Sequence, residues 1–220
     1  MDAGRRGAAG PRLGRTDEFR VRAQPASTGR AGFRPTGRGG NPWWRPVPPG
    51  YLPSMTMLQR LRADHAPALL AFERENRAYF AATVPDRGDA YFTGFDTRLA
   101  ELLAGQAAGE HHFHLLTDTS GAVLGRVNLV DVADGSAELG YRIAERAAGQ
   151  GLATAAAREV CRLARTGYGL RSLRAATTTD NGASRTVLTR AGFVECGGTT
   201  LSGLPGLRYL RVLGEADGDG

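Results

Sequence analysis

The sequence contains no lysine, only two cysteines, and no hydrophobic run long enough to cross a bilayer. Every basic side chain is therefore arginine. Two cysteines are too few for a disulfide scaffold, so we expect Cys161 and Cys196 to be reduced thiols, with Cys161 in a helix core. No apolar core follows the N-terminal arginines, so we expect no signal peptide. These absences predict a cytoplasmic protein that does not contact membranes.

The composition changes sharply near residue 54. Residues 1–54 hold ten arginines, three acidic residues and eight of the eleven prolines, which gives this segment a charge of +7. The remainder holds 18 arginines and 19 acidic residues, a charge of −1. The first segment has almost no apolar periodicity and would bury too little surface to offset the entropy of ordering. We therefore predict a disordered extension over 1–54, a folded domain over 55–213 and a flexible acidic tail over 214–220.

The N-terminal extension has two interpretations. An arginine-rich arm is typical of contact with RNA or the ribosome, and Trp43-Trp44 could add stacking. Alternatively, translation begins at Met55 or Met57 and the arm is an artefact of the assigned start.

The folded part alternates helix and strand patterns in a mixed order, with Asp64 as the expected cap of the first helix and a loop over 83–93. The predicted helices cover 64–80, 95–107, 152–165 and 181–190. The predicted strands cover 57–61, 112–117, 122–130, 137–143, 172–179, 193–200 and 207–212.

One glycine-bearing turn, Arg146-Ala-Ala-Gly-Gln-Gly-Leu152, connects a strand pattern to a helix pattern. The first N–H groups of a helix have no intrahelical partner, and the helix dipole places partial positive charge there. Gly149 and Gly151 lack a Cβ, so the backbone can approach a phosphate closely. The turn has neither the Lys-Ser/Thr ending of a P-loop nor dinucleotide-fold spacing. It therefore predicts a phosphate-bearing ligand at 146–152.

A second segment begins at Asn181, places Ser184 in the first turn of a helix and ends at Gly192-Phe193. Viewed alone, Asn181 is a good N-cap and Ser184 an ordinary helix residue. Together, the two segments resemble the GNAT acetyltransferase superfamily. The strings 72–80, 85–87 and 138–143 point to its ribosomal-protein-alanine (RimJ/RimL-type) branch. The resemblance covers about residues 57–213.

The resemblance implies an α+β fold, with a mixed, mostly antiparallel twisted sheet, helices on both faces and a splayed central pair, here 137–143 and 172–179. It implies acetyl-CoA as cosubstrate and a primary amine as acceptor. Backbone groups at the end of the first splayed strand would meet the pantetheine arm, one N–H would polarise the acetyl carbonyl, and the turn would hold the pyrophosphate. The implied donor-binding residues are Ile143, Ala144, Arg146, Ala148, Gly149, Gln150, Gly151, Leu152, Ala153 and Asn181.

The catalytic groups are the least defined part of the resemblance. Many superfamily members place a proton-donating tyrosine seven residues after the motif asparagine, but this chain has Leu188 there. Ser184 is the expected replacement, directly or through water. Glu138 is the candidate base, because strand alternation places it with Gly140 and Arg142 on one face. Two alternatives stay open: Glu138 pairs with an arginine on a solvated strand, or Glu75 and Asn76 shape the acceptor cleft.

The string His111-His112-x-His114 invites a metal interpretation. Alternation places His112 and His114 on one strand face, but no acidic or cysteine partner lies at ligand spacing. We therefore predict no metal site, and histidines beside the cleft or in solvent.

The function that these patterns favour is transfer of an acetyl group to a protein N-terminal α-amine, with a ribosomal protein as one such acceptor, in a ternary complex without an acyl-enzyme. The alternatives are acetylation of a small amine, such as an amino acid, an aminoglycoside or a polyamine, and a catalytically degenerate CoA-binding regulator. The chain is expected to be a monomer or a homodimer.

Overall fold

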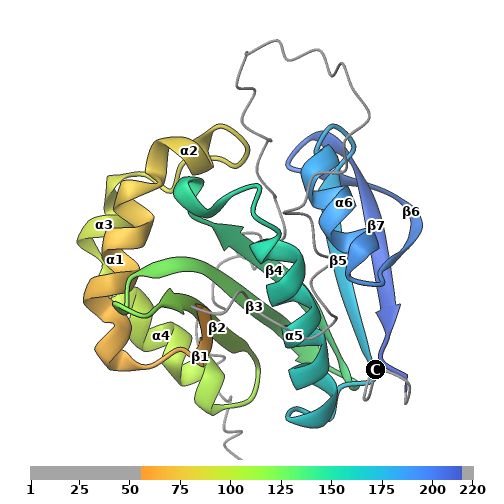
Figure 1. Ribbon diagram of the computed structural model, residues 1–220, viewed down its shortest axis with the longest axis horizontal. Helices are drawn as coiled ribbons and strands as arrows, with labels where there is room; N and C mark the ends of the chain where they lie inside the picture. The colour runs from red at the N-terminus through yellow and green to blue at the C-terminus, as the bar shows by residue number, and fades with distance from the viewer. Residues whose placement is uncertain (1–55, 215–220) are drawn as a thin grey trace, which may run out of the picture.

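A computed structural model describes residues 56–214 (Figure 1). The predicted extension over 1–54 and the tail over 214–220, apart from Gly214, lie outside this range. The described residues form a seven-stranded sheet in the order β1-β2-β3-β4-β5-β7-β6. Its strands are β1 (Thr56–Arg60), β2 (His112–Asp118), β3 (Val123–Ala133), β4 (Ser136–Ile143), β5 (Ser172–Thr178), β6 (Val194–Leu201) and β7 (Leu204–Val212).

Six α-helices and two 3-10 turns complete the described part of the chain. They are η2 (Ala63–His65), α1 (Ala66–Glu75), α2 (Arg77–Ala81), α3 (Asp89–Thr93), α4 (Phe95–Ala107), η3 (Glu145–Ala147), α5 (Leu152–Thr166) and α6 (Gly182–Arg190). No helix between residues 56 and 214 is both long and apolar enough to span a membrane.

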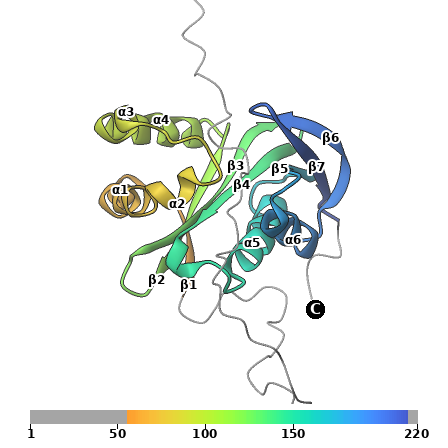
Figure 2. The same cartoon turned by 90° about the horizontal axis from the view of Figure 1, so that it is seen from above.

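The helices lie on both faces of the sheet. Figure 2 shows α1 to α4 on one face and α5 and α6 on the other. Helix α5 buries a single stripe that repeats every three to five residues, as an amphipathic helix must when one side packs on a sheet. The stripe consists of Leu152, Ala156, Ala157, Val160, Cys161 and Ala164. The mixed, mostly antiparallel architecture predicted from the sequence is confirmed, and Cys161 is buried in its core.

Strands β4 and β5 are the only parallel neighbours in this sheet, and they separate early. Their register joins Ser136 to Ser172, Ala137 to Leu173 and Glu138 to Arg174, and no pairing follows. Beyond these three pairs β4 stays bonded to β3, and β5 to β7. The predicted splayed pair is therefore present, closed at residue 138 and open toward Ile143.

Two predictions about the N-terminal half are wrong. The expected helix over 64–80 is broken at Asn76, whose side-chain amide donates to the Phe72 carbonyl at 2.9 Å while its backbone leaves the helical region. Asp64 does not cap this helix, because it lies in η2 and forms an ion pair with Arg62.

The segment over 83–93, expected to be a loop, contains the short helix α3. Gly88, with φ of 72°, precedes it, and Asp89 in its first turn forms an ion pair with Arg77 at 2.6 Å. A long-range ion pair of this kind is invisible to local sequence patterns.

Candidate active site

The turn between β4 and α5 has the form expected of an anion site. Gly149 and Gly151 adopt φ of 75° and 77°, a left-handed conformation that glycine adopts without strain. Gly151 is the N-cap of α5 and offers no side chain to the first helix amides. The side chain of Gln150 donates to the Arg146 carbonyl at 3.0 Å, and Arg146 donates to the Val123 carbonyl at 3.3 Å. The first bond closes the turn on itself, and the second holds it to the start of β3.

The turn leaves open space beside the first amides of α5. A Cβ added at Gly149 or Gly151 would meet no atom within 4 Å, so both positions face open space. The first amides of α5, at Leu152 and Ala153, start a 15-residue helix whose dipole favours negative charge. Ala148 differs from the expectation, because its amide already donates to the Glu145 carbonyl at 3.1 Å.

The end of β4 presents alternate backbone groups to the splayed gap. Antiparallel pairing with β3 makes 140 and 142 hydrogen-bonded positions, so the N–H and C=O of Tyr141 and Ile143 point to the opposite side, where β5 diverges. Ala144 is placed differently from the prediction. Its N–H donates to the Leu124 carbonyl at 2.8 Å, and its carbonyl accepts from Ala147 at 2.9 Å. The backbone groups of Ile143 therefore point into the splayed gap, whereas those of Ala144 are bonded to Leu124 and Ala147, and a contact of Ile143 with pantetheine stays a prediction.

Two hydroxyl groups meet on the α5–α6 side of the gap. Ser184 is fully buried, and its Oγ lies 3.1 Å from the Tyr141 hydroxyl. Asn181 caps α6, as predicted, because its side-chain oxygen accepts from the Ser184 backbone amide at 3.1 Å. Burial raises the pKa of Tyr141 above its usual range, although the bond to Ser184 opposes this. Both hydroxyls therefore stay protonated at neutral pH.

Sequence reasoning missed Tyr141. Strand alternation places Tyr141 on the face opposite Glu138, Gly140 and Arg142, and a buried tyrosine among apolar neighbours needs a partner for its hydroxyl. The partner is 43 residues away, so only the fold reveals it. Leu188, at the position of the family tyrosine, is fully buried in the core and contributes only packing.

The other face of β3 and β4 carries polar groups that point toward α1 and α2. Glu138, Gly140 and Arg142 share this face, as predicted, and are paired with Val130, Asn128 and Arg126 of β3. Asn128 is 5% exposed, and its side-chain oxygen has no hydrogen-bond partner among the described residues. Glu138 lies at the closed end of the pair, about 10 Å along the strand from Tyr141. Asn128 and Glu138 on this face are therefore the candidate groups for contact with the acceptor amine.

A buried carboxylate, Glu73 of α1, binds three arginines on this face. Its oxygens lie 2.6 Å from Arg126, 3.3 Å from Arg87 and 3.4 Å from Arg142. Burial alone raises the pKa of Glu73, but the three guanidinium charges outweigh it and lower that pKa to about 2. The cluster joins α1 and the 84–87 segment to β3 and β4, and nothing in the local sequence signals it.

Asn76 has a structural role that connects this side to the donor turn. Its side-chain oxygen accepts from the backbone amide of Glu145 at 2.9 Å, while its amide holds the Phe72 carbonyl. The end of α1 is thereby bonded to the residue that precedes Arg146. Glu75, the other residue considered for the acceptor cleft, ends α1 and is exposed.

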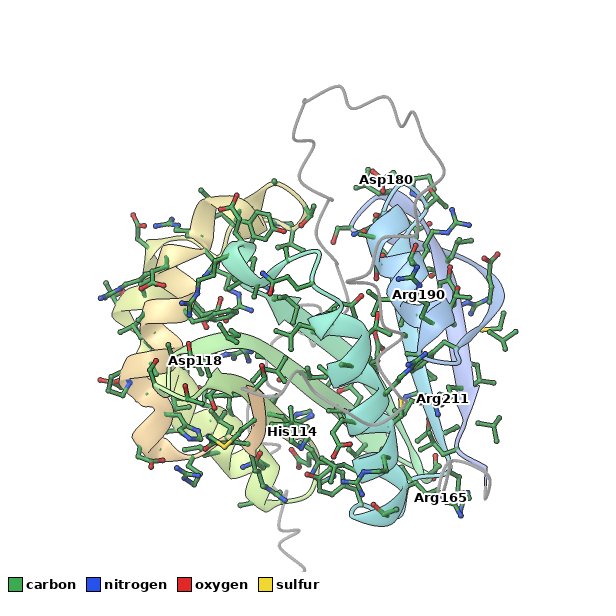
Figure 3. The ribbon with its side chains drawn as sticks, in the orientation of Figure 1. His114, Asp118, Arg165, Asp180, Arg190 and Arg211 are labelled. Carbon is green, nitrogen blue, oxygen red and sulfur yellow. The ribbon has the colours of Figure 1, made fainter. Side chains whose placement is uncertain are left out.

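The histidines form a separate cluster on the sheet. His112 stacks on Tyr168 with ring centroids 3.7 Å apart, and His114 accepts from the Tyr168 hydroxyl at 2.8 Å while its Nδ1 donates to the Val127 carbonyl. Burial lowers the pKa of both to about 4. Figure 3 shows His114 far from Asp180, which precedes the α6 N-terminus. Within 56–214, no three His, Cys, Asp or Glu side chains are grouped to hold a metal ion.

Comparison with known proteins identifies the class. The family model described as an acetyltransferase (GNAT) domain matches residues 56–194, more than half of the chain. The chain therefore belongs to the GNAT acetyltransferase family and is an acetyl-CoA-dependent N-acetyltransferase. A comparison with curated proteins finds no match.

Solved structures confirm the fold. The ribosomal-protein-S5-alanine acetyltransferase from Vibrio fischeri is 18% identical, with a TM-score of 0.70 over 75% of this chain and 97% of that chain. RimJ from Mycobacterium smegmatis, in complex with CoA-disulfide, is 22% identical, with a TM-score of 0.65 over 71% and 81%. A spermidine N-acetyltransferase mutant from Vibrio cholerae is 17% identical, with a TM-score of 0.58 over 73% and 95%.

Proposed function

We propose that the chain moves the acetyl group of acetyl-CoA to the N-terminal α-amine of a protein, by direct attack in a ternary complex. The observation that carries the proposal is the Tyr141–Ser184 hydroxyl pair, which lies at the open side of the β4–β5 gap. The likeness to RimJ and to a ribosomal-protein-alanine acetyltransferase supports a protein acceptor. An α-amine, with a pKa near ~8, also loses its proton more readily than a lysine side chain, near ~10.4.

In this proposal the donor binds along the gap. The amides of 149–153 and the side chain of Arg146 hold the pyrophosphate, with Asn181 fixing the neighbouring α6 N-terminus. The backbone groups of Ile143 meet the pantetheine arm. A backbone N–H of this strand donates to the acetyl oxygen, where negative charge develops as the amine attacks.

The hydroxyl pair then stabilises the leaving thiolate. Ser184 donates a hydrogen bond to sulfur and Tyr141 donates one to Ser184, both keeping their protons, and solvent protonates the thiolate as CoA leaves. The bond from nitrogen to carbon forms as the bond from carbon to sulfur breaks. Neither cysteine takes part, since Cys161 is buried in α5 and Cys196 lies on β6, the edge strand.

The acceptor approaches from the opposite face, because the hydroxyl pair occupies the α5–α6 side. There the unpartnered oxygen of Asn128 can accept from the amine and orient it, and Glu138 receives the released proton through water. The contact of residues 1–54 with RNA or the ribosome stays a prediction, as does the oligomeric state.

An acceptor panel tests the proposal. Thiol release from acetyl-CoA is measured with short peptides that begin with Ala or Ser, and with spermidine, an aminoglycoside and free amino acids. We expect the highest kcat/KM with the peptides. Turnover restricted to small amines contradicts a protein acceptor. Thermal stabilisation by acetyl-CoA without thiol release from any acceptor contradicts an enzymatic role.

A further inference from the structure

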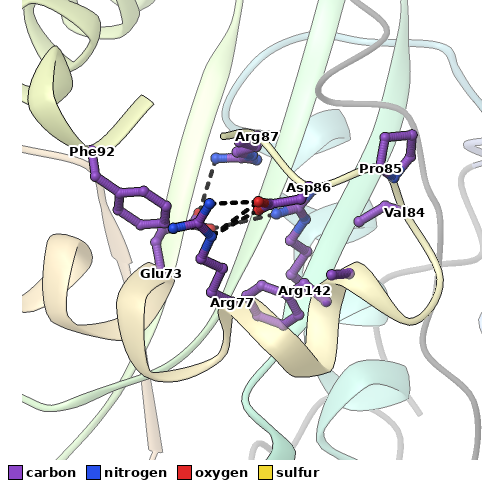
Figure 4. A pocket seen from close by; sticks show the side chains of 10 residues that line it. Glu73, Arg77, Val84, Pro85, Asp86, Arg87, Phe92 and Arg142 are labelled. Atoms are coloured by element: carbon purple, nitrogen blue, oxygen red, sulfur yellow. Dashed lines mark hydrogen bonds and ion pairs between the residues drawn. The ribbon is translucent and has the colours of Figure 1, made fainter. Parts of the chain in front are cut away.

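A hollow on the α1–α4 face lies directly beside the end of β4. It is formed by α1, α2, α3, the segment over 84–87 and β4. Figure 4 shows the side chains of Glu73, Arg87 and Arg142 meeting there. Arg142 immediately precedes Ile143, so the hollow adjoins the part of β4 that faces the splayed gap.

The buried part of the hollow has more positive than negative charge. Glu73 is the carboxylate shared by Arg87, Arg126 and Arg142, whose side chains are 10%, 3% and 14% exposed. These four side chains carry a net charge of +2. The shortest ion pair among them joins Arg126 to Glu73. Burial, reinforced by the charge of Arg87, lowers the pKa of Arg142 to about 10, which still leaves it charged at neutral pH.

Charged side chains at the mouth of the hollow lower its net positive charge but do not cancel it. Arg77 lies there between Asp86 and Asp89, each 2.6 Å from a guanidinium nitrogen, and these three groups carry −1. The charged groups at the hollow therefore sum to +1. A buried guanidinium is costly unless an anion pairs with it, so the arrangement favours a ligand with one negative charge.

One arginine has unused hydrogen-bonding capacity. The Nε of Arg87 is buried and has no hydrogen-bond partner between residues 56 and 214, and its Nη1 reaches Glu73 only at 3.3 Å. The Arg87 guanidinium lies 4.4 Å from the centre of the Tyr91 ring, and Arg142 lies 5.1 Å from that of Phe80. Aromatic faces fix the planes of both guanidinium groups, which suits bidentate recognition of a carboxylate.

We infer that the hollow binds a carboxylate of the acceptor, so that the preferred acceptors carry an acidic group close to the reacting amine. The inference rests on the proposed function and specifies its acceptor. The carboxylate belongs either to an acidic residue next to the N-terminus of a protein or to a free acidic amino acid. A polycation such as spermidine is disfavoured by the same charges.

Matched acceptors test this inference. kcat/KM is measured for peptides that differ only by Asp or Asn at the second position after an N-terminal Ala, and for free aspartate against asparagine. Pairing with buried guanidinium groups predicts at least about tenfold preference for the acid. Preference in the peptide pair identifies a protein acceptor, and preference only in the free pair identifies an amino acid. Equal rates in both pairs overturn the inference but leave the transferase proposal intact. No turnover with any acceptor overturns both.

Variants assign the preference to the hollow. Arg87→Gln removes the charge and is expected to reduce the acid preference to about twofold or less. Arg62→Gln is the matched control, because Arg62 is exposed and pairs with Asp64 outside the hollow. Since loss of a buried charge can unfold the protein, Arg87→Lys keeps the charge and is expected to retain a larger preference than Arg87→Gln. Full preference in a folded Arg87→Gln variant contradicts the assignment.

Discussion

Replacing Gly149 with glutamate perturbs the proposed pyrophosphate site most directly. Gly149 has φ of 75° and open space around it, so the new side chain meets no clash in the free protein. Its main structural cost is the left-handed backbone, roughly 1–2 kcal/mol for a residue with a Cβ. Its functional cost is a carboxylate beside a bound diphosphate.

The size of the functional effect follows from Coulomb's law. Two unit charges about 6 Å apart repel by about 0.7–2.8 kcal/mol for effective dielectric constants of 80 to 20. Each 1.4 kcal/mol is a factor of ten, so acetyl-CoA affinity is expected to fall about 3- to 100-fold. The larger values apply if the carboxylate faces the diphosphate away from bulk water.

The chain offers a matched control for this variant. Gly169 has φ of 64°, is exposed and has the same open surroundings, but it lies beyond the other end of α5. The 15 residues of α5 separate the two glycines by about 22 Å. Gly169→Glu therefore introduces the same strain and charge far from the turn. We expect both variants to lose similar stability and only Gly149→Glu to lose donor affinity by calorimetry. Equal affinity losses, or none, refute the placement of the diphosphate.

Three further predictions follow from buried polar groups. Ser184→Ala is expected to lower kcat about 100-fold, and Tyr141→Phe less, with donor affinity little changed; equal losses in both quantities indicate a binding role instead. The free energy of unfolding is expected to fall as the pH drops from about 6.5 to 4, because the folded pKa values of His112 and His114 lie below the unfolded one; His114→Gln weakens this dependence. Glu73→Gln leaves buried guanidinium groups without their carboxylate and is expected to cost about 3 kcal/mol or more in chemical denaturation, and a smaller loss indicates a solvated cluster.

Local patterns were sufficient for most of the scaffold. Strand periodicity located the sheet to within a few residues, and α4 matches its predicted range of 95–107. Asn181 caps α6 as expected, because the cap depends only on neighbouring residues. The break at Asn76 was not predicted, and the side-chain oxygen of Asn76 binds the amide of Glu145, 69 residues later, a partner that local patterns do not reveal.

In the site, too, features set by neighbouring residues could be predicted, and features set by distant partners could not. The turn over 146–152 is contiguous, and its glycines indicate its conformation directly. Tyr141 and the arginines around Glu73 acquire their roles from partners 14 to 69 residues away, so spacing along the chain carried no signal for them. For Ala144, the sequence predicted the position at the strand end. It did not reveal that the Ala144 amide would donate to Leu124 of β3.

The account depends most on acetyl-CoA binding at the α5 N-terminus. Isothermal titration of acetyl-CoA into the full chain measures this binding directly. We expect saturable heat with one donor per chain, and weaker binding for a CoA fragment that lacks the diphosphate. Absence of heat at millimolar acetyl-CoA with folded protein, or equal affinity for the fragment, contradicts the account.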